Sequence, residues 1–166
     1  MKYATLTFLL FMAFIGAAFA QNPNTPLYNG YFFVGPGAAT GDCCCSSATT
    51  MHIGGGVEGT LYKGLGAGIE LGYLGPMEAM QDGIGMLSVD GAYYFRTKTS
   101  TKVVPFVNAG YTLAFREGVL NAINFGGGIQ YWFHKRIGLR LEFRDHIAPM
   151  EPDTHLWNFR IGMALR

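Results

Sequence analysis

Large apolar residues alternate with charged residues or glycine along residues 137–144, which read Ile-Gly-Leu-Arg-Leu-Glu-Phe-Arg. Successive side chains of a β-strand point to opposite faces of the sheet. One face of this segment is therefore apolar, and the other carries Arg140, Glu142 and Arg144. The same alternation recurs along most of the chain. A closed barrel with a lipid-facing outside and a polar inside has this pattern, so the sequence predicts a transmembrane barrel.

Reading the chain with a period of two gives a set of candidate strands, each close to the ~9–11 residues that cross a bilayer at a tilt. They cover residues 28–39, 51–61, 65–74, 84–95, 103–115, 121–133, 137–144 and 156–166. Tyr62-Lys63-Gly64 predicts a tight turn, which makes the second and third strands a hairpin. The predicted fold class is all-β, an eight-stranded antiparallel up-and-down barrel.

Two glycine triplets, residues 54–56 and 126–128, lie inside these strand patterns. They could form loops, but the alternation continues in phase on both sides, which favours strand interiors. Glycine within a strand marks bends and close backbone approaches, which a small, strongly curved barrel requires. Residues 54–59 also fit the G-x-G-x-x-G pattern formally, but no helix or βαβ unit follows, so we expect no nucleotide site.

The expected connections alternate in length. Those after the second, fourth and sixth strands are short or wholly polar. The others are longer and less regular, over residues 41–50, 75–83, 116–120 and 148–155. Short turns at one end and longer loops at the other are typical of outer-membrane barrels, with turns in the periplasm and loops outside. An even strand count also places both ends of the barrel domain on the periplasmic side.

The first twenty residues have the pattern of a cleaved secretion signal, which leaves residues 21–166 as the barrel domain. Lys2 supplies a positive start, Leu6 to Phe19 is an apolar core, and Ala18-Phe19-Ala20 is a small-residue cleavage site. The apolar core is short for a membrane anchor. After Gln21, no apolar run approaches the ~20 residues of a helical span. We therefore expect export to a bacterial outer membrane.

The amino-acid composition favours a membrane protein and argues against a nucleic-acid-binding protein. Charged residues are 14% of the 166 residues, and 24 residues are glycine, which suits a surface that partly faces lipid. The formal net charge is +1 and the basic residues are scattered, so we expect no nucleic acid as partner. Aromatic residues at strand ends predict interfacial girdles: Tyr31, Phe32, Tyr73, Phe95, Phe106, Tyr131, Phe133 and Trp157. The alternative is a soluble carrier whose apolar face is the inside.

Several charged residues share the inward phase of the strands. They are Glu58, Glu70, Asp90, Arg140, Glu142, Arg144 and Arg160. The interior of an eight-stranded barrel is just wide enough for side chains to fill, and a buried unpaired charge is very costly. We therefore predict a structural salt-bridge and hydrogen-bond network that closes the lumen. The alternative is a narrow gated conduit in which Arg140 or Arg144 exchanges partners.

Cys43-Cys44-Cys45 lies in the first long loop, where neighbouring cysteines rarely bridge each other. Three thiols could bind a soft metal. Further potential ligands lie near another loop at the same end of the barrel: His146, Glu151, Asp153 and His155. Metal sites normally space their ligands more widely, as in C-x₂-C, so we predict no metal site here.

The alternating strands from Met51 to Arg166 resemble the small outer-membrane β-barrel family, the eight-stranded group of outer-membrane protein A- and X-like barrels. The last strand, Trp157 to Arg166, adds to the likeness through Gly162 and its alternating apolar residues. It ends on Leu165-Arg166, where the family usually ends on an aromatic residue. The resemblance implies the fold and an outer-membrane location. It also implies membrane lipids and the barrel-assembly machinery as partners of a monomer, and no particular activity.

Some barrels of this size modify lipid A, and deacylases among them carry a His-x-Ser-Asn element near their C-terminal strands. Here Asp145-His146-Ile147-Ala148 supplies the histidine without the serine, so we predict no enzyme, catalytic residue or cofactor, and place His146 at the rim. The favoured function is a structural or surface-interaction role. The alternatives are a porin-like narrow pore or a carrier of small hydrophobic ligands, followed by a lipid A-modifying enzyme.

Overall fold

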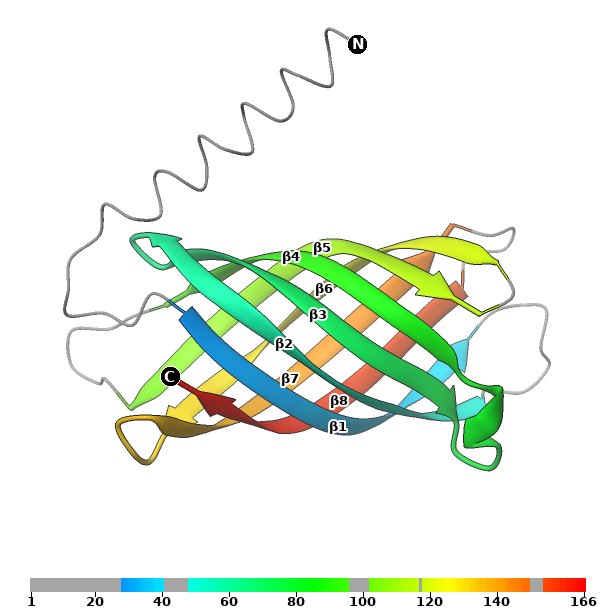
Figure 1. Ribbon diagram of the computed structural model, residues 1–166, viewed down its shortest axis with the longest axis horizontal. Coiled ribbons are helices and arrows are strands. Elements are labelled where there is room, and N and C mark those ends of the chain that lie inside the picture. Colours follow the sequence, from blue (N-terminus) through cyan, green and yellow to red (C-terminus); the bar gives the residue numbers. More distant parts are fainter. Residues whose placement is uncertain (1–27, 41–47, 96–101, 117, 150–153) are drawn as a thin grey trace, which may run out of the picture.

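In the computed structural model, eight strands close into a single barrel (Figure 1). Residues 28–40, 48–95, 102–116, 118–149 and 154–166 are described. The strands are β1 (Tyr28–Thr40), β2 (Ala48–Tyr62), β3 (Leu65–Pro76), β4 (Ile84–Tyr94), β5 (Val103–Phe115), β6 (Val119–Trp132), β7 (Ile137–Ala148) and β8 (Thr154–Leu165). Each pairs antiparallel with the next, and β1 pairs with β8 to close the barrel. The predicted fold class is confirmed.

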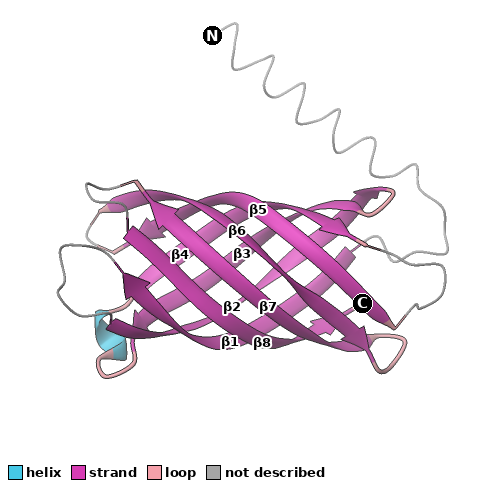
Figure 2. Ribbon diagram, turned by 180° about the vertical axis from the view of Figure 1, so that it is seen from behind, coloured by secondary structure: helices cyan, strands magenta, loops and turns pink. Residues whose placement is uncertain are grey.

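A short 3₁₀ turn, η1 (Met80–Asp82), is the one helical element of the described residues. Those residues include no helix that is long and apolar enough to cross a membrane. We call the end of the barrel that carries η1 the loop rim. The opposite end, where β1 begins and β8 ends, is the termini rim, and Figure 2 shows the two at opposite ends of the barrel.

The predicted strand boundaries are correct for β5 and too short for β7. The alternation fails after Arg144, because Asp145 and His146 are both buried. Pairing with β8 nevertheless continues as far as Ala148, which lies opposite Thr154 of β8, since backbone hydrogen bonds do not depend on the side-chain pattern. His146 therefore lies near the loop rim, but its side chain points into the barrel and is fully buried.

Glycine makes two local features possible. In the tight turn between β2 and β3, Lys63 and Gly64 both have positive φ, 41° and 95°, as the favoured two-residue hairpin turns require. The two glycine triplets lie within β2 and β6, which confirms the expected strand interiors. A Cβ atom on Gly54 would lie 2.6 Å from the carbonyl oxygen of Leu71 on the neighbouring strand. The backbones therefore approach each other closely at this glycine.

The two faces of the strands differ as the alternation predicted. Outward residues are large and apolar, such as Leu71 and Phe159, which are 61% and 59% exposed. Their neighbours Glu70 and Arg160 point inward and are buried. Phe32, Phe95, Tyr131 and Phe133 are exposed on the outer face, whereas Tyr73 and Trp157 are half-buried.

Two aromatic residues depart from the predicted girdles. Tyr31 and Phe106 are buried in the lumen, because they occupy the inward phase of β1 and β5. Aromatic type alone cannot distinguish an inward from an outward position at a strand end.

The lumen is filled in three layers. Next to the termini rim lies an apolar layer of Tyr31, Phe33, Ala92, Tyr94, Val104, Phe106, Trp132 and Ala164. Next to the loop rim lies a smaller apolar layer of Leu74, Met86 and Ala114, against which Ile84, Leu120 and Leu156 pack. Between the two layers lie the charged side chains.

Candidate functional site

The charged network of the lumen is built from strands on opposite walls of the barrel. It consists of Glu58 (β2), Glu70 (β3), Asp90 (β4), Arg140, Glu142 and Arg144 (β7) and Arg160 (β8). Alternate positions of one strand share a face, so β7 alone supplies the central run of three. All seven residues named from the sequence lie here, and every one of them is less than 10% exposed.

The arginines pair with carboxylates across the lumen. Around the closed barrel, β7 lies three strands from β2 and three from β4, and β8 lies three from β3. Arg140 of β7 binds Glu58 of β2, with Nη1 3.0 Å from Oε2. Arg144 of β7 binds Asp90 of β4 at 2.6 Å. Each pair therefore connects nearly opposite walls and obstructs the axis of the barrel.

Arg160 on β8 makes the third crossing. Its Nη1 donates to both carboxylate oxygens of Glu70 on β3, at 2.9 and 3.1 Å. Its Nη2 lies 3.0 Å from Nδ1 of His52. An arginine side chain only donates, so this histidine nitrogen is the acceptor. His146 lies beside His52, with 6.0 Å between the ring centres.

Glu142 is the hub of the network. It accepts from Nε of Arg140 at 2.9 Å and binds Arg144 at 2.7 Å, and Arg160 lies 4.0 Å away. Asn108 also donates to it at 2.8 Å. One carboxylate therefore faces all three guanidinium groups, which spreads its charge over several charge-assisted hydrogen bonds.

Neutral groups complete the shell around the charges. Tyr31 donates to Glu70 at 2.8 Å, Gln130 to Glu58 at 3.1 Å and Asn124 to Asp90 at 2.8 Å. The arginines also lie against aromatic rings. The guanidinium carbon of Arg140 is 4.2 Å from the ring centres of both Tyr31 and Phe106. Such contacts suit a weakly hydrated cation held in a dry lumen.

The amide, tyrosine and histidine partners carry no distinctive sequence motif. The phase of the alternation places Asn108, Asn124, Gln130 and His52 inward, but it does not pair them with particular charges. Pairing depends on which strands face each other across the closed barrel, since Gln130 and Glu58 are 72 residues apart in the sequence. Only the closed topology brings them together.

The described residues contain no group of three or more His, Cys, Asp or Glu side chains that could hold a metal ion. Cys43, Cys44, Cys45, Glu151 and Asp153 lie outside the described residues, as does the signal segment. The two remaining residues considered for this site have different partners. His155 pairs with Asp145 at 2.9 Å, while His146 is buried beside His52.

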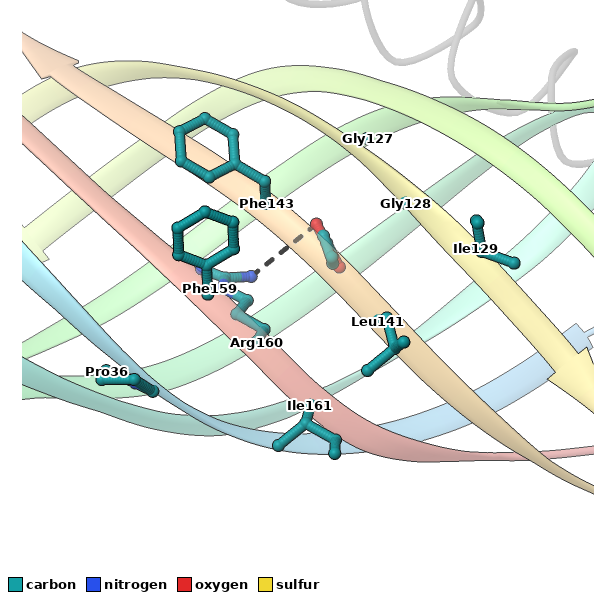
Figure 3. Close-up of a pocket in the computed structure, with 10 residues that line it drawn as sticks. Pro36, Gly127, Gly128, Ile129, Leu141, Phe143, Phe159, Arg160 and Ile161 are labelled. Atoms are coloured by element: carbon teal, nitrogen blue, oxygen red, sulfur yellow. Dashed lines mark ion pairs between the residues drawn. The ribbon is translucent and has the colours of Figure 1, made fainter.

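The outer wall has a shallow hollow of about 440 Å³ over β6, β7 and β8 (Figure 3). Its outward lining is apolar and includes Leu141, Phe143 and Phe159. Glu142 and Arg160 also border it, but they belong to the lumen network and face each other. The carboxylate of Glu142 is held by Arg140 and Arg144, and the apolar character of the outward lining is that of a lipid-facing wall.

No protein-family profile matches the chain, and no curated protein sequence is detectably similar to it. Solved structures do resemble it. Neisserial surface protein A has a TM-score of 0.67 at 11% identity, over 84% of this chain and 97% of that one. The N-terminal β-barrel domain of OprF from Pseudomonas aeruginosa has a TM-score of 0.59 at 14% identity, over 84% and 98%.

A transmembrane β-barrel designed de novo is also similar, with a TM-score of 0.58 at 18% identity over 86% of this chain and 97% of the design. These likenesses confirm the expected resemblance to small eight-stranded transmembrane barrels at the level of the fold. A designed barrel among them illustrates that the fold by itself does not imply an activity.

Proposed function

We propose that this protein is an exported outer-membrane barrel whose closed lumen makes it a rigid, non-conducting scaffold for surface loops. Residues 1–20 are its cleaved signal and residues 21–166 its monomeric barrel domain. One observation carries the proposal: three arginine–carboxylate pairs cross the lumen between two apolar layers. A pore needs a continuous polar path, whereas this interior is filled by side chains and its arginines are paired with carboxylates across the lumen.

The location is supported by the likeness of the fold to outer-membrane barrels, one of which is called a surface protein. It is also supported by the apolar outer face, which would be costly in water. The short turn at Lys63-Gly64 belongs to the termini rim, as periplasmic turns do in such barrels. The loop rim would then face the outside of the cell.

Electrical recording tests the closed lumen. The chain is refolded into planar bilayers, and its folded state is verified by heat-modifiable migration on a gel. We expect no conductance steps from the folded protein. Regular steps whose size scales with salt concentration would instead support the narrow pore and overturn the scaffold.

Orientation is tested separately on intact cells with a maleimide reagent too large to cross the outer membrane. Single cysteines are placed at Glu78 on the loop rim or at Lys135 on the termini rim, in a background where Cys43, Cys44 and Cys45 are serine. Both positions are exposed. We expect labelling of Glu78→Cys alone. Labelling of Lys135→Cys alone would reverse the orientation, and recovery of the protein in a detergent-free soluble fraction would overturn the location.

A further inference from the structure

The termini rim carries a hollow that the proposed scaffold role does not use. Its volume is about 470 Å³ and it is lined by Lys102, Trp132, Phe133, His134, Lys135 and Arg166. This volume falls within the roughly 300–1,000 Å³ of small-ligand pockets. The lining combines cations with aromatic rings and includes no acidic residue.

Backbone hydrogen bonds assemble this lining from two connections and the end of β8. The amide of Trp132 donates to the carbonyl of Lys102 at 2.7 Å, and that of Arg166 donates to Arg136 at 3.0 Å. Strands β5 to β8 are consecutive around the barrel. Cations that are distant in sequence therefore gather in one sector of the rim.

Trp132 gives the hollow a buried polar group. The side chain is 4% exposed, and its Nε1 has no hydrogen-bond partner among the described residues. This nitrogen can only donate, and a buried donor without an acceptor is costly. The guanidinium carbon of Arg166 lies 3.7 Å from the Trp132 ring centre. The hollow therefore has cations and an aromatic ring on the same side of the barrel rim.

The network carboxylates do not pair with Lys102 or Lys135, because the apolar layer next to the termini rim lies between them. Trp132 and Val104 belong to that layer. Glu58 is already held by Arg140 at 3.0 Å. The positive charges of Lys102 and Lys135 are therefore exposed at the termini rim, where an anionic group can reach them.

The sequence distributes charge unequally between the two rims. Among the described connecting residues, those of the termini rim include no Asp or Glu, and their basic residues are Lys63, Lys102, Lys135 and Arg136. Those of the loop rim include the acidic residues Glu78 and Asp82 and the basic residue Arg116. Clustered Lys and Arg at a membrane surface attract anionic lipid headgroups.

We propose that the hollow at the termini rim binds the headgroup phosphate of an anionic phospholipid. The inference rests on the proposed function only in that the barrel must span a bilayer. Phe133 lines the hollow and is 54% exposed on the outer face, where an aromatic belt marks the headgroup level. Lys102 and Lys135 bind the phosphate beside the Trp132 ring, and the acyl chains lie along the outer wall.

The test uses Trp132 as its own reporter. The chain contains two tryptophans, so Trp157→Phe leaves Trp132 as the single fluorophore. The protein is refolded into phosphatidylcholine vesicles that contain a minority of spin-labelled phosphatidylglycerol or spin-labelled phosphatidylcholine, with the label near the headgroup. We expect stronger quenching by phosphatidylglycerol, and a preference that weakens as salt is raised.

Lys102→Gln and Lys135→Gln should each reduce the preference about fivefold, the effect of one cation near an anionic surface. Arg116→Gln on the loop rim is the matched control and should leave it unchanged. In detergent, inorganic phosphate distinguishes a lipid site from a general anion site. If free phosphate and unlabelled phosphatidylglycerol relieved the quenching of Trp132 by spin-labelled phosphatidylglycerol equally well, the lipid assignment would be overturned.

Equal quenching by the two lipids would overturn the site, as would a preference that survives both lysine substitutions. Heat-modifiable migration of each sample shows separately that the barrel is folded. If the protein inserted into neither bilayer, the proposed membrane role would fail together with this site. A folded, inserted barrel with no lipid preference would leave the scaffold role intact and refute the hollow alone.

Discussion

Arginine and lysine occur in two opposite situations in this barrel. In the middle of the lumen, Arg140, Arg144 and Arg160 are at most 3% exposed, and each is held by carboxylates on other strands. At the termini rim, Lys102 and Lys135 are exposed and line a hollow without an acidic residue. Buried cations must be paired, so they stabilise the fold and are occupied. Cations at the rim retain their water and remain available to a ligand.

The largest effect should follow from removal of the hub of the network. Glu142→Gln keeps the size of the side chain but takes a negative charge away from three buried guanidinium groups. Breaking a buried ion pair from one side costs about 3–5 kcal/mol. We expect the free energy of unfolding in lipid vesicles, measured with urea, to fall by this amount.

Glu78→Gln is the matched control for this substitution, because Glu78 is exposed near the loop rim. Surface charges contribute little, so we expect its unfolding curve to overlay that of the parent protein. Equal urea unfolding curves for Glu142→Gln and Glu78→Gln would show that the lumen tolerates unpaired charge. Buried and exposed charges would then not differ in their contribution to stability.

A smaller loss in the free energy of unfolding should follow where the neighbouring strands β6 and β7 approach each other closely. A Cβ atom on Gly128 would collide with the carbonyl oxygen of Leu141 on β7, so Gly128→Ala requires a shift of the backbone. Overpacking of this kind costs typically 1–3 kcal/mol. In Gly91→Ala the nearest atom to the new Cβ lies 3.8 Å away, and urea unfolding of that variant should be unchanged. A loss of equal size at both positions would contradict the close approach.

The neutral part of the network should contribute less again. Ser88 and Thr112 are hydrogen-bonded at 2.8 Å and both are buried. Ser88→Ala leaves the Thr112 hydroxyl with Asn124, which already donates to it at 3.0 Å. We expect a loss of about 1 kcal/mol by urea unfolding, the net value of a typical hydrogen bond. A loss as large as that of Glu142→Gln would mean that the charges are not the dominant part of the network.

Much of this fold could be predicted from the sequence because one rule, the period of two, reports which face of a strand meets lipid. Strand β5 follows that rule along its length, and the residues on both sides of the glycine triplets follow it as well. The rule fails at Asp145 and His146, where consecutive residues are both buried and only pairing to β8 continues the strand. Aromatic type, by contrast, cannot tell Tyr31 from Phe32, since only the phase separates the buried residue from the exposed one.

The members of the site could be predicted, but their contacts could not. Phase alone places Arg140 and Glu58 inside. Their contact arises from the closure of β1 on β8, which brings β7 within reach of β2. The hollow at the termini rim could not be predicted for the same reason. Lys102, Lys135 and Arg166 are scattered in the sequence and come together only when the strands close into a barrel.

The smallest effect should come from the ion pair at the loop rim, which contrasts most sharply with the lumen. Arg116 and Asp82 lie 3.1 Å apart, but their side chains are 45% and 56% exposed. Water screens such a pair, and exposed pairs contribute roughly 0–1 kcal/mol. Arg116→Gln should therefore shift urea unfolding by less than about 1 kcal/mol, and added salt should remove the difference. A larger, salt-insensitive loss would mean that this pair is shielded from water, so that pairing at the loop rim is under the same constraint as pairing in the lumen.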